Sequence, residues 1–387
     1  MKRITILTCL ILSLTASSQG TWVPKASLTG VARWGSVGFS IGSYGYVGTG
    51  LDASSNYTND FWRYDPSTDS WAQMTNFLGS ARELATGFSM NGKGYLGTGY
   101  DGAYKNDFYE YDPGGNSWTV KANFPGNART SAVSFAIGVN GYLGTGNFNS
   151  TLYNDFYQYD PTGNSWTAKA NVGGGLRNDA VGFSIGSYGY IGTGNGNNFW
   201  QYDPGANAWT QKASVGPAPR YGAFGFSLNG KGYLGTGYST VFLQDFYEYD
   251  PIGNTWTPMA NFLGTARTFS VAFSIGTKGY AGTGSDVGGL TKKDWYEYTP
   301  TPTGINLLEN NLSATIFPNP VNSSATVEVK GSIGNSEFVL FDLNGKKVSE
   351  TNFSGAFTFE RNDLNAGIYL YQIKNNNKLV TGKLVIE

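Results

Sequence analysis

Few residues of this chain could do acid–base chemistry. The sequence contains no His, and its single Cys is Cys9, so histidine-based acid–base catalysis and a Ser-His-Asp triad are excluded. The remaining candidates are carboxylates, namely Glu83, which follows Arg82, and Asp179. Because a glycosidase needs two carboxyl groups roughly 5–9.5 Å apart, Glu83 and Asp179 are the best candidate catalytic pair, with Arg82 beside them.

Both carboxylates lie in a pattern that occurs six times. Each copy has a Trp, an Arg eleven positions later, a Gly-Tyr-x-Gly-Thr-Gly motif and an Asp-Phe-x-x-Tyr-Asp-Pro element or a close variant of it. The tryptophans are Trp22, Trp71, Trp118, Trp166, Trp209 and Trp256, and the arginines are Arg33, Arg82, Arg129, Arg177, Arg220 and Arg267. Only the distance from the last Gly to the third element varies, at 11, 9, 10, 5, 9 and 11 positions. All length variation therefore lies in one loop per repeat.

Each repeat predicts four short strands. The segment "GFSIGSYGYVGTG" indicates two strands around a Gly-containing turn, and "DFYEYDPGGNSWT" indicates a third strand, a turn and a fourth strand. Four strands in 43 to 49 residues are typical of one propeller blade. The 55 Gly residues and the 16% aromatic content suit tight turns and aromatic packing between blades. We therefore predict an all-β fold with a six-bladed β-propeller.

The ends of the repeat array predict how the ring closes. Trp22 begins a fourth-strand pattern with no first three strands before it, and the sixth repeat, 267–300, ends without a Trp. We expect the strand around Trp22 to Lys25 to complete the sixth blade.

The variable loops predict where a ligand would bind. In a blade whose strands run up and down, the second-to-third loops and the connections between blades open on the same face, so the variation gathers on one rim. Variable loops on a rigid scaffold are a usual place for binding, and aromatic side chains suit sugar faces and protein hot spots. Candidate ligand-binding residues, each specific to one blade, are Trp34, Tyr57, Glu83, Tyr100, Tyr104, Phe148, Tyr153, Asn178, Asp179, Tyr221, Tyr238 and Phe242.

The six repeated Arg residues enter at this same face. They could form a cationic ring for an anionic sugar or carboxylate, or they could bind backbone carbonyls of their own or the next blade. We favour the second interpretation, because a single asymmetric ligand does not need six identical contacts. The repeated Asp residues are too far apart around the ring to share a metal, so we predict that they cap turns or strands and that the protein has no metal and no cofactor. These aspartates are Asp60, Asp107, Asp155, Asp245 and Asp294.

This order of glycine motif, Tyr-Asp-Pro and Trp resembles the kelch repeat over residues 21–300. The kelch family includes the propeller of galactose oxidase. The copper site of that enzyme uses two His ligands and a Tyr cross-linked to Cys, and the mature chain has neither His nor Cys, so galactose oxidase activity is excluded. Some kelch propellers are sugar mutarotases or epimerases, and by this resemblance Arg82 and Glu83 could serve such a reaction.

Three function classes follow. The preferred hypothesis is a non-catalytic secreted or cell-surface protein whose rim binds a glycan or a protein partner. The first alternative is a carbohydrate-active enzyme of mutarotase, epimerase or glycosidase type that uses Arg82, Glu83 and Asp179. The second alternative is a structural spacer at the cell surface. We expect a monomer.

The N-terminus has the pattern of an export signal. Lys2 and Arg3 precede a mainly apolar run, and small residues end at Ser18, which predicts a signal peptide over 1–18. The run is too short to cross a membrane, and we expect no membrane span after its removal. Without these two residues, 24 basic residues face 27 acidic ones, so the mature charge of −3 offers no basic face for nucleic acid.

The composition changes after the propeller, which we place at 19–303. Alternating β-type runs such as "EFVLFDLNG" and "GIYLYQIK" predict a small β-sandwich over 304–387. The motif "FPNP" at 317–320 and the final segment "NAGIYLYQIKNNNKLVTGKLVIE" resemble the C-terminal sorting domain of the type IX secretion system. By that resemblance, this domain engages the type IX machinery and directs the protein to the outer-membrane cell surface or the medium. The alternative is an accessory carbohydrate-binding or immunoglobulin-like module.

Overall fold

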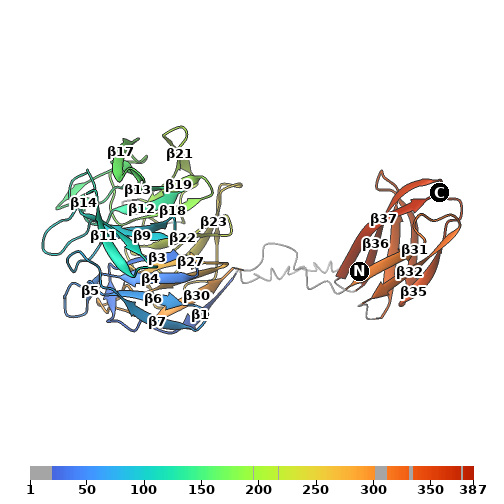
Figure 1. Ribbon diagram of the computed structural model, residues 1–387, viewed down its shortest axis with the longest axis horizontal. Coiled ribbons are helices and arrows are strands. Elements are labelled where there is room, and N and C mark those ends of the chain that lie inside the picture. The colour runs from blue at the N-terminus through green and yellow to red at the C-terminus, as the bar shows by residue number, and fades with distance from the viewer. Residues whose placement is uncertain (1–19, 195, 217, 301–311, 331–333, 376–377) are drawn as a thin grey trace, which may run out of the picture. The chain divides into compact units, whose positions relative to one another are not determined.

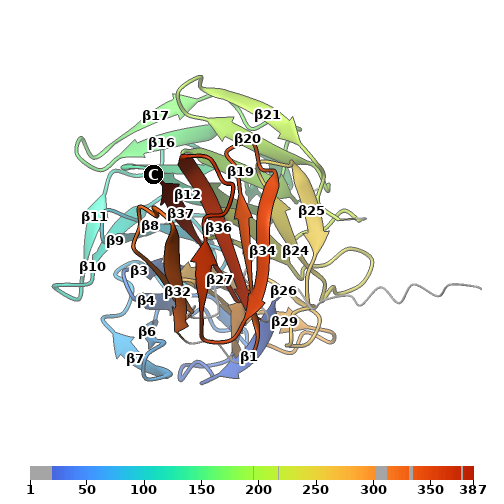
Figure 2. The ribbon, with the colours of Figure 1, turned by 90° about the vertical axis from the view of Figure 1, so that its right-hand side faces the viewer.

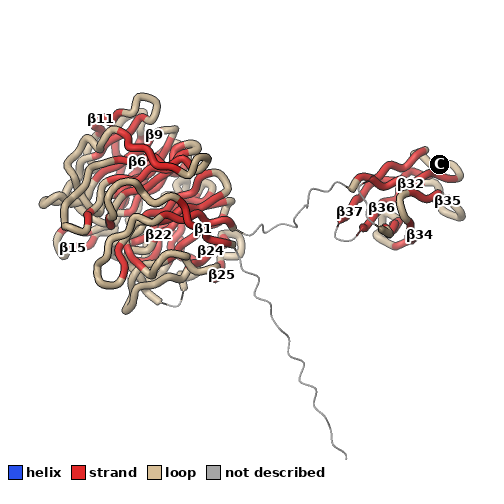
Figure 3. The backbone as a smooth tube through the Cα atoms, turned by 90° about the horizontal axis from the view of Figure 1, so that it is seen from below, coloured by secondary structure: helices blue, strands red, loops and turns tan. Residues whose placement is uncertain are grey.

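The computed structural model describes residues 20–194, 196–216, 218–300, 312–330, 334–375 and 378–387 (Figure 1). The predicted signal peptide over 1–18 lies outside these residues. The chain divides into two compact units, Met1–Thr301 and Pro302–Glu387. The described residues contain strands and loops but no helix (Figure 3). None of them therefore forms a helix long and apolar enough to span a membrane.

The first unit consists of six four-stranded antiparallel sheets, the blades, which follow one another around a ring in chain order (Figure 2). Blade 1 contains β3 (Val37–Ile41), β4 (Tyr44–Gly48), β6 (Phe61–Asp65) and β7 (Ser70–Met74). Blade 2 contains β8 (Thr86–Met90), β9 (Lys93–Gly97), β10 (Phe108–Asp112) and β11 (Ser117–Lys121). Blade 3 contains β12 (Val133–Ile137), β13 (Asn140–Gly144), β16 (Phe156–Asp160) and β17 (Ser165–Lys169).

The second half of the ring repeats this order. Blade 4 contains β18 (Ala180–Ile185), β19 (Tyr188–Thr193), β20 (Phe199–Asp203) and β21 (Ala208–Lys212). Blade 5 contains β22 (Phe224–Leu228), β23 (Lys231–Gly235), β24 (Phe246–Asp250) and β25 (Thr255–Pro258). Blade 6 contains β27 (Val271–Ile275), β28 (Lys278–Gly282), β30 (Trp295–Thr299) and β1 (Thr21–Lys25). The predicted six-bladed all-β propeller is confirmed.

Three of the blades also have a pair of two-residue strands on the loop side. They pair as β2 (Arg33–Trp34) with β5 (Leu51–Asp52), β14 (Asn147–Phe148) with β15 (Thr151–Leu152), and β26 (Arg267–Thr268) with β29 (Ser285–Asp286). These ladders give the variable loops a fixed backbone.

The ring closes as the sequence predicted. Strand β1 pairs antiparallel with β30, with Trp22 opposite Tyr298. The Trp22 ring lies 5.1 Å from that of Phe246 in blade 5. The fourth-strand Trp of every other blade makes the same contact with the preceding blade, at 5.0–5.2 Å between ring centroids. Edge-on pairs of this kind each contribute about 0.5–1.5 kcal/mol beyond their buried area. The predicted aromatic packing between blades is therefore confirmed.

The innermost strands alternate large and small residues. In β3, Val37, Phe39 and Ile41 are buried, and Gly38 lies between the first two. A Cβ atom at Gly38 would lie only 2.9 Å from the Cβ of Val271 in blade 6. Glycine therefore permits the close approach of neighbouring inner strands.

The second unit packs two antiparallel sheets around its own core. One sheet contains β31 (Ser313–Phe317), β32 (Ser324–Lys330) and β35 (Ala356–Glu360); the other contains β34 (Lys347–Phe353), β33 (Ser336–Phe341), β36 (Gly367–Asn375) and β37 (Lys378–Ile386). Side chains from both sheets, including Val327, Phe338 and Leu384, form the buried cluster between them. This arrangement is the small β-sandwich predicted for the C-terminal segment.

Candidate functional site at the loop-rich rim

The six repeated Arg side chains belong to the scaffold. All six are 0–2% exposed, and Nη1 of each donates to the carbonyl of the Thr in Gly-Thr-Gly, at 2.7–3.4 Å. The preference for backbone carbonyls over a cationic ring is therefore borne out by the geometry. Side chains this deeply buried present no cationic ring to a ligand.

The repeated Asp residues have a role that the sequence interpretation missed. In five blades, Nη1 and Nη2 of the buried Arg donate to the two oxygens of the Asp before the third strand, at 2.5–2.6 Å and 2.6–2.7 Å. The pairs are Arg33–Asp60, Arg82–Asp107, Arg129–Asp155, Arg220–Asp245 and Arg267–Asp294. Predicting caps for these aspartates was wrong, because each carboxylate pairs with a buried guanidinium, whose charge is costly to bury alone.

A closed ring of backbone hydrogen bonds surrounds the channel mouth. The second residue after each Arg has a positive φ of 50–64°, and its N–H donates to the carbonyl of the corresponding residue in the preceding blade, at 2.7–3.3 Å. The ring runs through Gly35, Leu84, Ser131, Asp179, Gly222 and Phe269. Four of these residues are not glycine, and each costs about 1–2 kcal/mol in this conformation, which the inter-blade bonds help to offset.

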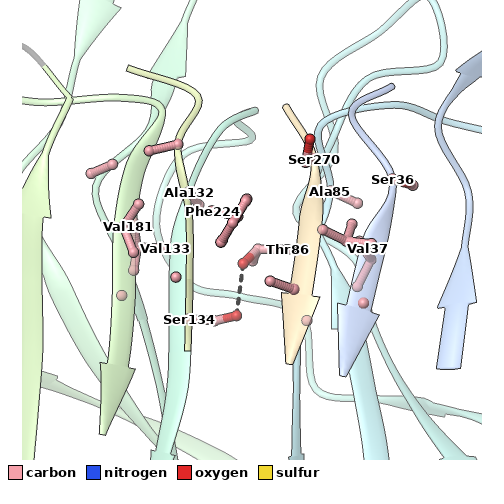
Figure 4. Close-up of a pocket in the computed structure, with 18 residues that line it drawn as sticks. Ser36, Val37, Ala85, Thr86, Ala132, Val133, Ser134, Val181, Phe224 and Ser270 are labelled. Atoms are coloured by element: carbon pink, nitrogen blue, oxygen red, sulfur yellow. Dashed lines mark hydrogen bonds between the residues drawn. The ribbon is translucent and has the colours of Figure 1, made fainter. Parts of the chain in front are cut away.

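Below this ring lies the central channel. Its mouth is a cavity of about 120 Å³ lined by the ring residues and by the small residues that follow them, including Ser36, Ala132 and Ser270. A deeper cavity of about 160 Å³ continues between the inner strands (Figure 4). There the hydroxyls of Thr86 and Ser134 lie 2.7 Å apart across two blades (Figure 4). The channel can therefore hold water or a small molecule, and we expect a larger ligand to bind at the rim.

Asp179 is the acidic residue that lines the mouth cavity. One carboxylate oxygen accepts a hydrogen bond from Nδ2 of Asn178 at 2.9 Å. Desolvation raises the pKa of Asp179 from its ordinary value of 3.8 to about 6. A carboxyl group with such a pKa could act as an acid or a base near neutral pH.

Glu83 lies elsewhere on the rim. Its backbone pairs with that of Tyr100 through two hydrogen bonds of 2.9 Å, and burial raises the pKa of its carboxyl to about 6. Its Oε2 atom is buried and has no hydrogen-bond partner among the described residues. Glu83 does not line the Asp179 cavity, and blade 3 lies between the two residues in the ring.

Aromatic side chains of three blades form one row on the rim. Tyr57 of blade 1 contacts Tyr100 of blade 2, Tyr100 contacts Tyr104, and Tyr104 contacts Phe148 of blade 3. The centroid distances are 6.1, 5.1 and 4.8 Å. The three Tyr side chains are partly exposed and Phe148 is exposed. We call these four residues the aromatic row.

The other predicted aromatic residues make separate contacts. Tyr221, Tyr238 and Phe242 form a second group within blade 5, with centroids 5.3 and 5.1 Å apart. Trp34 packs on Phe269 of blade 6 at 5.2 Å. Tyr153 covers the buried guanidinium of Arg129 at 4.2 Å, so it is shared with the scaffold.

Sequence reasoning missed Leu84, Ser131 and Phe269 at the channel mouth. The repeat spacing could have identified them, because each lies two residues after a repeated Arg and directly follows the residue that varies from blade to blade. Within the described residues, no cluster of acidic, His or Cys side chains is arranged to hold a metal ion.

Comparison with known proteins gives the class. Residues 315–387 match the secretion system C-terminal sorting domain, and residues 45–78 match the kelch motif. The solved structure described as "Structure of YjhT" has a TM-score of 0.61 at 17% sequence identity, covering 71% of this chain and 97% of that chain. This likeness concerns the fold alone. No match was found among curated proteins.

The chain therefore combines a β-propeller that contains a kelch motif with a C-terminal sorting domain of the type IX secretion system. Such a domain implies interaction with the secretion machinery and marks a secreted or cell-surface protein. Both resemblances seen in the sequence are confirmed.

Proposed function

We propose that this secreted protein binds a glycan at the rim of its propeller, with the aromatic row as the main contact surface. The observation that carries the proposal is the row itself: Tyr57, Tyr100, Tyr104 and Phe148 join three blades through ring contacts of 4.8–6.1 Å and stay partly exposed. Aromatic rings combine a flat apolar face with, in Tyr, a polar edge, which matches the C–H faces and hydroxyls of sugars.

The proposal includes the organisation of the chain. Residues 1–18 are an export signal, 19–303 form the propeller, and 304–387 form the sorting domain that delivers the propeller to the surface. Deleting 304–387 should leave the propeller in the periplasm, as measured by fractionation. Normal secretion of the truncated protein would contradict the sorting role and leave the rim proposal standing.

The rim is tested by a glycan array with the purified mature chain, followed by affinity measurements on the strongest glycan. Tyr100→Ala should weaken binding about tenfold or more, since aromatic hot spots commonly contribute more than 1 kcal/mol. Tyr188 offers a matched control, because it is 39% exposed and begins β19 directly after the β18–β19 turn, away from the variable loops. Tyr188→Ala should bind like the wild type. An array without any specific glycan would favour a protein partner.

A second candidate function is sugar chemistry at the rim. It is supported by the pKa values of Glu83 and Asp179, both about 6, although the two groups lie on blades separated by a third. Turnover on a panel of sugars that is lost in Glu83→Gln, with the fold intact, would support this candidate. Absence of turnover across the panel would leave binding as the function.

A further inference from the structure

One blade lacks the ion pair that the other five share. The position of the repeated Asp is occupied in blade 4 by Asn198. Arg177 is nevertheless only 2% exposed. Among the described residues, the side-chain hydrogen bonds of Arg177 go only to backbone carbonyls, those of Gly173 at 2.8 Å and Thr193 at 3.4 Å. Blade 4 therefore keeps the buried cation and lacks its anion.

Blade 1 shows what the missing carboxylate would contact. The oxygens of Asp60 accept hydrogen bonds from Nη1 of Arg33 at 2.5 Å, from Nη2 at 2.6 Å and from the indole Nε1 of Trp62 at 2.7 Å. One carboxylate thus satisfies three donors at once. Blade 4 also has a Trp at the position of Trp62, namely Trp200.

In blade 4, the Arg and Trp donors pack against Gly174, the residue that corresponds to Gly30 of blade 1. A Cβ atom at Gly30 of blade 1 would lie 2.8 Å from Nη2 of Arg33 and 2.7 Å from Nε1 of Trp62. A Cβ atom at Gly174 of blade 4 would lie 2.6 Å from Nη2 of Arg177 and 2.4 Å from Nε1 of Trp200. The guanidinium and the indole N–H therefore lie close to the same glycine in both blades, although no carboxylate joins them in blade 4.

Several of these polar atoms have no partner. Nε of Arg177, Nε1 of Trp200 and Oδ1 of Asn198 are buried and lack a hydrogen bond within the described part of the chain. Desolvation lowers the pKa of Arg177 to about 10. A buried charge without an opposite charge is costly, so an anion that reached the guanidinium and the indole N–H would accept charge-assisted hydrogen bonds from them.

The anion position lies near the surface, although Oδ1 of Asn198 and Nε1 of Trp200 are themselves buried. In the other five blades the Arg side chain is 0–1% exposed, whereas its Asp partner is 22–32% exposed. Asn198 and Trp200 are likewise partly exposed. The loop between β19 and β20 is also the shortest of the six variable loops. A small group can therefore approach from solvent.

We propose that blade 4 contains a binding site for a carboxylate, formed by Arg177, Trp200 and Asn198, in which the ligand takes the place of the Asp that the other blades supply themselves. The ligand class is a small carboxylic acid or an exposed carboxylate of a larger molecule. This site does not rest on glycan binding by the aromatic row, and either can fail without the other.

The probe is sodium acetate, with acetamide as its neutral counterpart and sodium chloride as a second anion. The melting temperature of the purified mature chain should rise with acetate concentration by a few degrees, and acetamide or chloride should have a smaller effect. Asn198→Asp should fold, because Asp is the residue of the other five blades. It should melt at a higher temperature and show no specific response to acetate.

A reciprocal variant completes the test. Asp60→Asn gives blade 1 the same Arg, Asn and Trp as blade 4, so it should melt lower and acquire an additional response to acetate. Equal acetate responses in the wild type and Asn198→Asp would overturn the site. An equal response of the wild type to chloride would overturn the assignment to a carboxylate.

Discussion

The channel side and the loop side of the propeller follow opposite rules. Around the channel, the same Arg, Thr and aromatic residues recur from blade to blade, and Nη1 of each buried Arg donates to the carbonyl of a repeated Thr. On the rim, loop length and aromatic residues vary among the blades. Repetition therefore marks residues that hold the ring together, and departures from it mark candidate sites. The two departures that matter most are the aromatic row and the unpaired Arg177.

The largest expected effect comes from breaking a repeated pair. Asp107→Asn should lower the free energy of unfolding by about 3 kcal/mol, because it leaves the guanidinium of Arg82 buried without its anion. Chemical denaturation of the purified protein measures the change. A loss below about 0.5 kcal/mol would mean that the repeated pairs contribute little to the scaffold.

A smaller effect is expected from the carboxyl at the channel mouth. Burial raises the pKa of Asp179 above its ordinary value of 3.8, to about 6, so its ionised form destabilises the fold once the pH rises through this range. Asp179→Asn should therefore stabilise the protein by about 1–2 kcal/mol at pH 8. The gain should vanish near pH 4, where the wild-type carboxyl is protonated.

The same variant can be compared across pH by thermal unfolding. Asn also adopts positive φ readily, so the backbone ring should persist. A stabilisation by Asp179→Asn that is equal at pH 4 and pH 8 would show that charge is not its cause.

The contact between Thr86 and Ser134 should give an effect of about 1 kcal/mol. Blades 1 and 4 have Val37 and Val181 at the position of Thr86, so Thr86→Val alone leaves the hydroxyl of Ser134 without its partner at 2.7 Å. Adding Ser134→Gly gives the two positions the Val and Gly that blades 1 and 4 have there, and should recover most of the loss. A double-mutant cycle measures this coupling, and additive losses would contradict it.

The smallest effect on stability is expected on the rim. Tyr100→Ala removes two ring contacts on a partly exposed surface, so the free energy of unfolding should fall by only about 0.5 kcal/mol. Denaturation of this variant beside Asp107→Asn separates the scaffold from the rim. Similar losses in the two variants would remove the distinction.

The fold could be predicted from the sequence because the fixed spacing of the repeated motifs determines the order of the strands and blades. Fixed intervals gave the strands, and the displaced Trp22 gave the closure with β30. The spacing of the repeats could not predict the ion pair between Arg82 and Asp107, which lie 25 positions apart. Alternation along a strand shows which side chains share a face, but it does not show which charged groups contact each other. The intrinsic backbone preferences of Leu and Phe also could not predict a positive φ at Leu84 and Phe269. The hydrogen bonds between blades override those preferences.

The candidate site was predictable as a region and only partly as a set of contacts. Loop lengths placed Tyr57, Tyr100 and Tyr104 on one rim, but their contacts across blades depend on the ring geometry. Tyr153 was selected by the same logic, yet it packs over Arg129. A side chain specific to one blade can thus also cover a feature that all blades share.

One paired affinity measurement tests most directly whether the aromatic row is the binding surface. The strongest glycan from the array is titrated into the wild type, Tyr100→Ala and Tyr188→Ala under identical conditions. The row predicts about tenfold or greater weakening in Tyr100→Ala and unchanged affinity in Tyr188→Ala. Unchanged affinity in Tyr100→Ala, or equal weakening in both variants, would contradict it.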